Sequence, residues 1–286
     1  EEALEQYNQI LADHPEHTRA MGAMASIYER QERWDELMEI YKRRLALVGN
    51  GEERVQTLRG IARIAEFQAE DFTPIALINF DPAAFHIAAG RDWQNVEEAV
   101  AAIKADPQGT YKMSGTAVGA AYHLAFAGFL QQQGIDPLKV TMVPSQGAAP
   151  GFQELAAGGV QIIPSSLPEG KTMMDAGLSR AIAVFSEERN ASFPEVPTAS
   201  EQTGEPFAGG TWRGVVGPAG MDAEAAARLE EATQAVFDSE AFQGFMSKQG
   251  FGADYRGSEA FETFLAETQQ SVGAVMKSIG LSQREN

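Results

Sequence analysis

Residues 110–134 read TYKMSGTAVGAAYHLAFAGFLQQQG, and this stretch indicates the fold class. Tyr111–Gly115 has the composition of a short strand that enters a loop, and Gly119–Gln132 is an apolar helix that Gly134 ends. A strand that leads through a glycine-containing loop into a helix is the repeating unit of α/β proteins. The stretch therefore predicts an α/β fold.

The same alternation extends to both sides. Strands are expected at 73–78, 84–89, 140–144, 160–163 and 181–185, and helices at 96–104, 152–157 and 171–176. Asp92 is expected to cap the helix at 96–104. Regular alternation of strand and helix predicts a largely parallel sheet that is covered on both faces.

Helices dominate the C-terminal part. A strand is expected at 211–218, where Pro218 ends it. Asp222 can then cap a long helix to Phe237, and further helices are expected at 240–249 and 258–278. Tyr255–Gly257 is expected only to separate the last two helices.

The first 68 residues have a different pattern, with apolar residues at helical spacing and a period of 34 residues. Ala3 pairs with Leu37, and Tyr7 pairs with Tyr41. This period resembles a tetratricopeptide repeat, and it predicts helices at 2–13, 17–31, 33–47 and 52–67. Residues 1–68 are therefore expected to form an all-α domain that can recruit a protein partner.

The aromatic residues of this segment have two interpretations. Packing between helices is the first, and a peptide-binding groove is the second, for Tyr7, Tyr28, Trp34 and Tyr41. His14 and His17 flank a turn, and they are expected to be solvated turn residues rather than a metal pair.

Composition excludes several functions. The formal net charge is −18, and no basic stripe is present, which argues against nucleic acid as a partner. The absence of cysteine excludes disulfides and thiolate chemistry. No apolar run is long enough to cross a bilayer, and no signal peptide is expected within these 286 residues. An acidic chain must hold an anion by local donors.

Several strings resemble the solute-binding proteins of tripartite tricarboxylate transporters. They are SGTAVG at 114–119, VPSQGAAP at 143–150, SLPE at 166–169, FPEVPT at 193–198, TWRG at 211–214, GFG at 250–252 and IGL at 279–281. The resemblance implies a two-lobe periplasmic-binding-protein-like fold, with capture of a small di- or tricarboxylate between the lobes. It also implies a periplasmic location and delivery of the ligand to a membrane transporter.

The resemblance covers about residues 71–286 and begins inside the family's first lobe. Family members open with a strand and a glycine-rich loop that forms one jaw of the ligand clamp, and no counterpart of either is found here. The resemblance therefore implies a second lobe at 84–208 and an incomplete first lobe at 71–83 and 209–286. The clamp is expected to be weakened.

The candidate binding residues lie where strands end and helices begin. Free N–H groups at a helix start, with glycines that allow close approach, suit a carboxylate. These positions and the resemblance together give the candidates Ser114, Gly115, Thr116, Val118, Gly119, Ala120, Gln146, Gly147, Ala148, Ser165 and Ser166. Trp212 is expected either to close the pocket or to fill the interior of the lobe. Arg213 is either a counter-charge or part of a surface ion pair.

Enzyme activity is not expected, and neither is a cofactor or metal. A serine nucleophile needs a histidine base and an orienting acid, and His123 alone does not supply them. Two functions remain open. The first is a carboxylate-binding protein, and the alternative is a helical-repeat scaffold that carries a non-functional binding domain.

Overall fold

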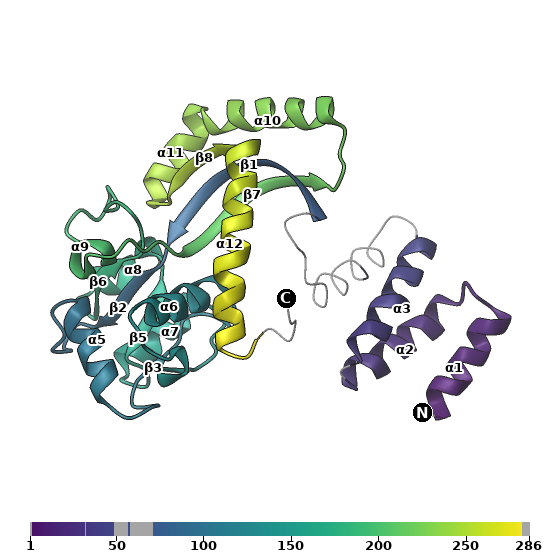
Figure 1. The fold of residues 1–286 in the computed structure, drawn as a ribbon, viewed down its shortest axis with the longest axis horizontal. Coiled ribbons are helices and arrows are strands. Elements are labelled where there is room, and N and C mark those ends of the chain that lie inside the picture. Colours follow the sequence, from purple (N-terminus) through teal and green to yellow (C-terminus); the bar gives the residue numbers. More distant parts are fainter. Residues whose placement is uncertain (1, 32, 49–56, 58–70, 282–286) are drawn as a thin grey trace. The chain divides into compact units, whose positions relative to one another are not determined.

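The computed structural model describes residues 2–31, 33–48, 57 and 71–281 (Figure 1). The chain divides into two compact units, Glu1–Gln68 and Ala69–Asn286. The boundary between the two units coincides with the change of sequence pattern near residue 70.

Three helices of the first unit are described, α1 (Glu2–Asp13), α2 (Thr18–Arg30) and α3 (Trp34–Leu47). They agree with the expected bounds to within one residue. Helix α2 packs against both α1 and α3. The apolar residues of helical spacing form the core, which contains Leu4, Leu11, Ala20, Met21, Met24, Ala25, Tyr28, Leu37 and Ile40. The fourth expected helix, at 52–67, lies outside the described residues.

The aromatic residues of this unit favour the packing interpretation. Tyr28 is buried, and Tyr7 and Tyr41 pack partly buried against the same core; the side chain of Trp34 is outside the description. His17 caps α2, because its Nδ1 accepts the Ala20 N–H at 3.1 Å. A capping role explains this histidine without a metal.

The second unit contains a five-stranded sheet of order β4-β3-β5-β2-β6. The strands are β2 (Ala84–Ala88), β3 (Lys112–Met113), β4 (Thr141–Met142), β5 (Ile162–Ser165) and β6 (Ser179–Val184). Strand β3 pairs in parallel with β4 and β5. Strand β2 pairs antiparallel with β5 and β6.

The expectation of a largely parallel sheet is therefore wrong for the pairings of β2. Strand β2 enters the sheet directly from β1 (Phe72–Pro82), with only Ala83 between them, and it runs opposite to β3 although a helix connects the two. Alternation of strand and helix predicts parallel pairing only where each helix returns the chain to the same edge of the sheet, and the helix between β2 and β3 does not.

Helices cover this five-stranded part. They are α5 (Val96–Ala105), α6 (Ala121–Gln132), α7 (Ala148–Ala156), α8 (Leu167–Asp175) and α9 (Ala199–Thr203), with a short 3-10 turn η2 (Pro137–Lys139). Four fully buried aromatic rings fill the core, Phe85, Phe126, Phe129 and Phe185. Asn95, and not Asp92 as expected, caps α5, because its side chain accepts the Glu98 N–H at 2.8 Å.

The three-stranded part is a second, antiparallel sheet of order β7-β1-β8. It comprises β1, β7 (Gly210–Pro218) and β8 (Ala253–Gly257), with helices α10 (Ala223–Phe237), α11 (Glu240–Gln249) and α12 (Ser258–Ser278). Asp222 caps α10 as expected. The segment that contains Tyr255–Gly257 pairs with β1 as strand β8, so the expectation of a simple separator is wrong.

Two connections and one helix join the parts. The chain crosses at Ala83 and again near Gly209, where the Ala83 N–H donates to the Gly209 carbonyl at 2.9 Å. Helix α12, yellow in Figure 1, extends from the three-stranded sheet to α6. Val275 of α12 packs there against Leu124 and Ala127.

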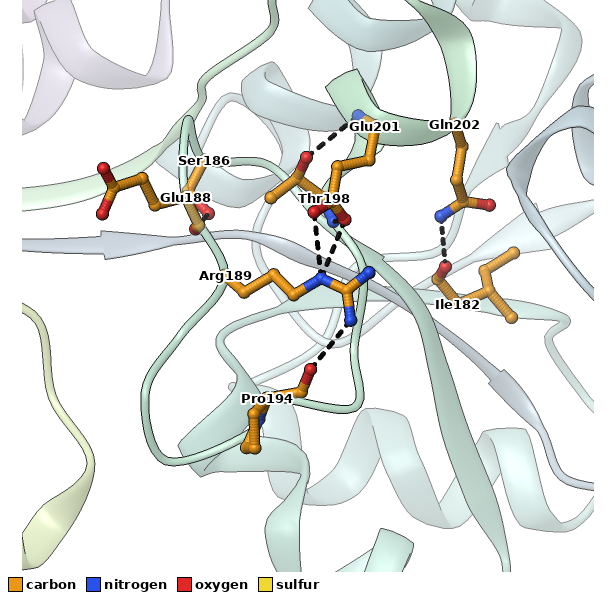
Figure 2. Close-up of polar contacts among 8 residues, drawn as sticks. All are labelled: Ile182, Ser186, Glu188, Arg189, Pro194, Thr198, Glu201 and Gln202. Atoms are coloured by element: carbon orange, nitrogen blue, oxygen red, sulfur yellow. Dashed lines mark hydrogen bonds and ion pairs between the residues drawn. The ribbon is translucent and has the colours of Figure 1, made fainter.

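A network of hydrogen bonds holds the loop before α9 (Figure 2). The Arg189 guanidinium donates to the Glu201 carboxylate at 2.9 Å and to the Pro194 carbonyl at 2.9 Å. Thr198 and Glu201 form a capping box, with the Thr198 N–H donating to Glu201 at 2.9 Å. The Thr198 N–H, and secondarily Arg189, lower the pKa of Glu201. The FPEVPT string thus builds a helix start.

An apolar groove of about 280 Å³ lies on the three-stranded part. It is lined by Ile78, Val215, Leu229, Ala232, Thr233, Val236, Phe237 and Phe242. Val236 is 61% exposed and Leu229 is 41% exposed. This face of the three-stranded part is thus open to solvent within the described chain.

His86 is a fully buried histidine in the middle of β2. Its ring lies edge-on to Phe152, and a Cβ atom on Gly170 would be 2.3 Å from its Cε1. Among the described residues, neither ring nitrogen has a hydrogen-bond partner of ordinary geometry. Burial lowers the pKa of His86 to about 4, and this outweighs the opposite effect of the Ser166 and Ser165 backbone.

This burial predicts that acid destabilises the fold. Between pH 6.5 and about 4 the unfolded chain binds a proton at His86 and the folded chain does not, so stability is full above pH 6.5 and falls as pH decreases. The loss at the lower limit is about 3 kcal/mol. Urea unfolding at several pH values measures it. We expect His86→Gln to flatten this dependence and His14→Gln, in an exposed turn, to leave it unchanged; an equal slope in both variants would contradict the assignment.

Candidate functional site

The first candidate loop connects β3 to α6. Ser114 and Thr116 are buried, and Val118 is 48% exposed. Gly115 and Gly119 have φ angles of 90° and 76°, which favour glycine. The loop therefore turns tightly at the carboxyl end of β3, as the sequence predicts.

Two of the expected backbone donors in this loop are already engaged. The Gly119 N–H donates to His123 Nδ1 at 2.9 Å, and the Ala120 N–H donates to the Ala117 carbonyl at 3.2 Å. Both hydrogen bonds lie within the loop and the first turn of α6, so neither N–H group is available to a ligand. Among the described residues, the N–H groups of Thr116, Ala117 and Val118 have no acceptor.

The second candidate loop lies directly beside the first. The Ser145 N–H donates to the Thr116 carbonyl at 2.9 Å. A Cβ atom on Gly151, in the first turns of α7, would be only 2.3 Å from the Gly115 Cα. Strands β3 and β4 are parallel neighbours, so both loops leave the same edge of the sheet. The structure thus brings the two predicted loops together.

The second loop also retains free donors. Gly147 has a φ of 130° and precedes α7, and Gln146 is exposed. In the described part of the chain, the N–H groups of Gln146, Gly147 and Ala148 have no acceptor. They belong to the start of a helix, where an anion is stabilised. Helix α7 begins earlier than the expected residue 152, which places this donor group next to the first loop.

Ser165 ends β5, Ser166 caps α8, and both side chains are hydrogen-bonded to Glu169. The Ser165 hydroxyl donates to Glu169 Oε2 at 2.6 Å, and the Ser166 hydroxyl donates to the same atom at 3.1 Å. Both serines are buried. Their hydroxyl protons hold the start of α8, so they can offer a ligand only an oxygen acceptor.

Tyr122 lies between the two parts of the unit. Burial raises the pKa of Tyr122, and the nearby Glu169 and Asp81 carboxylates raise it further, whereas Ser166 and Arg213 oppose the shift. Tyr122 belongs to the first turn of α6, and Asp81 and Arg213 belong to the three-stranded part. The phenol is therefore a neutral donor close to residues of both parts.

Trp212 and Arg213 are neighbours in β7 with different surroundings. The Trp212 ring lies 5.6 Å from that of Phe261 and 5.8 Å from that of Phe264. Trp212 is partly buried in this cluster, which favours the interpretation that it fills the interior of the three-stranded part. Arg213 forms an ion pair with Asp81 at 2.8 Å.

Metal or hydrolytic chemistry would depend on metal-ligating side chains or on His123. No group of three or more metal-ligating side chains occurs among the described residues. Burial lowers the pKa of His123, and its Nδ1 accepts the Gly119 N–H. This histidine is thereby explained as a loop anchor.

Sequence reasoning missed Tyr122, Asn79 and Asp81. One signal was available for two of them, because Asn79 and Asp81 are polar residues within the apolar strand β1. They are only 3% exposed, and buried polar groups normally have a specific partner. Tyr122 gave no such signal, since an aromatic residue in an apolar helix is ordinary.

A mixed five-stranded sheet, a smaller sheet joined to it by two crossings, and loops at the strand ends define a periplasmic-binding-protein-like fold. The model of the tripartite tricarboxylate transporter family receptor matches residues 51–281. The chain therefore belongs to this receptor family. A tetratricopeptide repeat model matches residues 20–55.

Known relatives agree with this assignment. A TctC solute-binding protein from Polaromonas, solved without ligand, is 30% identical with a TM-score of 0.65, over 77% of this chain and 73% of that one. An R. palustris protein solved with adipate is 24% identical with a TM-score of 0.60, over 73% and 69% of the two chains. A UPF0065 protein of Pseudomonas sp. (strain P51) is 29% identical over 56% of this chain.

The matches cover only part of the curated relatives. The chain spans 46% of the length of the Pseudomonas protein and between 57% and 65% of three others. No described helix of the chain has both the length and the apolar character of a membrane span.

Proposed function

We propose that this chain is a receptor that captures a small organic dicarboxylate in the periplasm for a membrane transporter. In this proposal, residues 84–208 form the second lobe, and residues 71–83 and 209–286 form part of the first lobe. The ligand lies between them and no covalent step occurs. Family membership and the adipate-bound relative support this choice of ligand class.

The observation that carries the proposal is the adjacency of the two loops. The hydrogen bond between Ser145 and Thr116 and the contact of Gly151 with Gly115 hold two sets of free N–H groups side by side. Each set precedes or begins a helix, so a carboxylate there gains hydrogen bonds and a favourable helix dipole of roughly 0.3–2 kcal/mol. This is how an acidic chain can hold an anion.

The scaffold function remains the second candidate. The repeat match at 20–55 favours it, since such repeats usually bind other proteins. In this alternative, the helical unit recruits a partner, and the binding part takes no ligand.

A thermal-shift screen separates the two functions. Ligand that binds only the folded state at about 100 times its dissociation constant stabilises it by about 2.7 kcal/mol. We expect adipate or another dicarboxylate to raise the unfolding temperature of the 286-residue chain by several degrees at high millimolar concentration. The matching diamides serve as controls and should have no effect. Equal shifts with diacids and diamides, or none with any acid, would reject the receptor function.

A further inference from the structure

Two buried residues of β1 accept hydrogen bonds from one nitrogen of the Arg213 guanidinium. Its Nη1 donates to Asp81 Oδ2 at 2.8 Å and also to Asn79 Oδ1. The other Asp81 oxygen accepts the Gly252 N–H at 2.9 Å. The Asp81 side chain is 4% exposed, whereas that of Arg213 is 60% exposed. A fixed carboxylate thus orients an open cation.

The rest of the guanidinium is available to a ligand. Arginine has five N–H donors in a planar fork that matches a carboxylate. Among the described residues, Nε and Nη2 of Arg213 form no hydrogen bond. The pairing with the buried Asp81 uses only Nη1, and it keeps that carboxylate from being a buried unpaired charge. This structural role does not require Nε and Nη2, which are available to a ligand.

Arg213 lies on the side of the three-stranded part that approaches α6. Strand β7 and α6 are in contact, and a Cβ atom on Gly209 would be 3.1 Å from the Ala125 Cβ. Tyr122 is within electrostatic reach of both Arg213 and Asp81. The first turn of α6 follows directly on the first glycine loop. Arg213 therefore lies on the side of the three-stranded part that is near the candidate loops of the five-stranded part.

We infer that Arg213 binds one carboxylate of the ligand, while the N–H groups of the two loops bind the other. This inference rests on the proposed function and specifies it. It makes Arg213 the residue that selects a dianion over a monoanion, because a ligand with one charged end leaves the guanidinium unmatched.

The test compares adipate with hexanoate, which has one carboxylate on a chain of equal length. NMR titration of the 286-residue chain measures dissociation constants into the millimolar range. We expect Arg213→Gln to weaken adipate binding roughly 10- to 100-fold, the effect of about one charge-assisted hydrogen bond. Hexanoate binding should change by less than about threefold.

Two further variants separate binding from folding. Asp81→Asn removes the buried charge but keeps the arginine, and it should retain adipate binding within about threefold, because Asn79 still holds Nη1. Arg256→Gln removes a similar arginine, paired with Asp254 at 2.8 Å in β8, and should have no effect on binding. Circular dichroism checks that each variant is folded.

The outcomes are distinct. Unchanged adipate binding in Arg213→Gln would overturn this inference and leave the receptor function standing, and so would an equal loss for adipate and hexanoate. Failure of the unaltered chain to bind any dicarboxylate would overturn the receptor function, and this inference with it.

Discussion

The 286-residue chain by itself is expected to bind adipate roughly 100- to 10,000-fold more weakly than the R. palustris relative solved with that ligand. The resemblance places the family's first glycine loop in the opening jaw of the clamp, and no counterpart of that loop is found in these residues. A buried charge-assisted hydrogen bond contributes roughly 1.5–3 kcal/mol, so the loss of two costs about 3–6 kcal/mol.

The measurement is a parallel titration of both proteins with adipate in the same buffer. An affinity within about tenfold of the relative's would show that other residues complete the clamp.

Gly151→Ala is expected to destabilise the second unit by about 2–3 kcal/mol and to weaken carboxylate binding about tenfold or more. Alanine normally stabilises a helix over glycine by about 1 kcal/mol. Here the added Cβ atom would lie 2.3 Å and 2.5 Å from two backbone atoms of Gly115. Because these are backbone atoms, the loop before α6 must move away from α7.

Gly244→Ala is the matched control for this substitution. Gly244 is also within a helix, α11, and a Cβ atom there meets nothing within 4 Å. We expect it to be neutral or slightly stabilising, with unchanged adipate binding. Urea unfolding measures the stability of both variants, and titration measures their affinity for adipate. Equal stability and equal affinity in the two variants would mean that the contact between the loops does not support binding.

Local sequence signals predicted the elements of the fold well but misplaced two helix starts. Helices α7 and α8 were expected at 152 and 171 and begin at Ala148 and Leu167. Each has a proline in its first turn, Pro150 and Pro168, where the missing N–H has no helical acceptor to lose. Both expected starts lay after the proline, so both helices were predicted too short.

Strand direction and pairing depend on contacts that no local pattern contains. Strand β2 is antiparallel to its neighbours, although a helix connects it to β3. Strand β8 forms only through pairing with β1, for example Arg256 with Leu77, about 180 residues earlier in the chain. Its five residues resemble an interhelical turn when taken alone.

In the candidate site too, local patterns predicted some features, and contacts between distant residues determined the others. The strand-to-helix loops at 114–120 and 145–148 were found from glycines and periodicity, and the structure places them side by side. The partners of two candidate residues were not foreseen. Glu169 accepts a hydrogen bond from the Ser165 hydroxyl and His123 accepts one from the Gly119 N–H, and no local pattern predicts either contact. Trp212 has two equal interpretations from local sequence alone, because its packing partner Phe261 lies 49 residues further on.

We propose that the two adjacent loops hold a carboxylate. The most direct measurement follows the backbone amide resonances of the full chain by NMR during titration with adipate. We predict the largest saturable shifts at residues 116–118 and 146–148, with smaller ones at Tyr122 and Arg213. Shifts confined to the apolar groove lined by Ile78, Val215 and Phe237, or no saturable shift at either loop, would contradict the account.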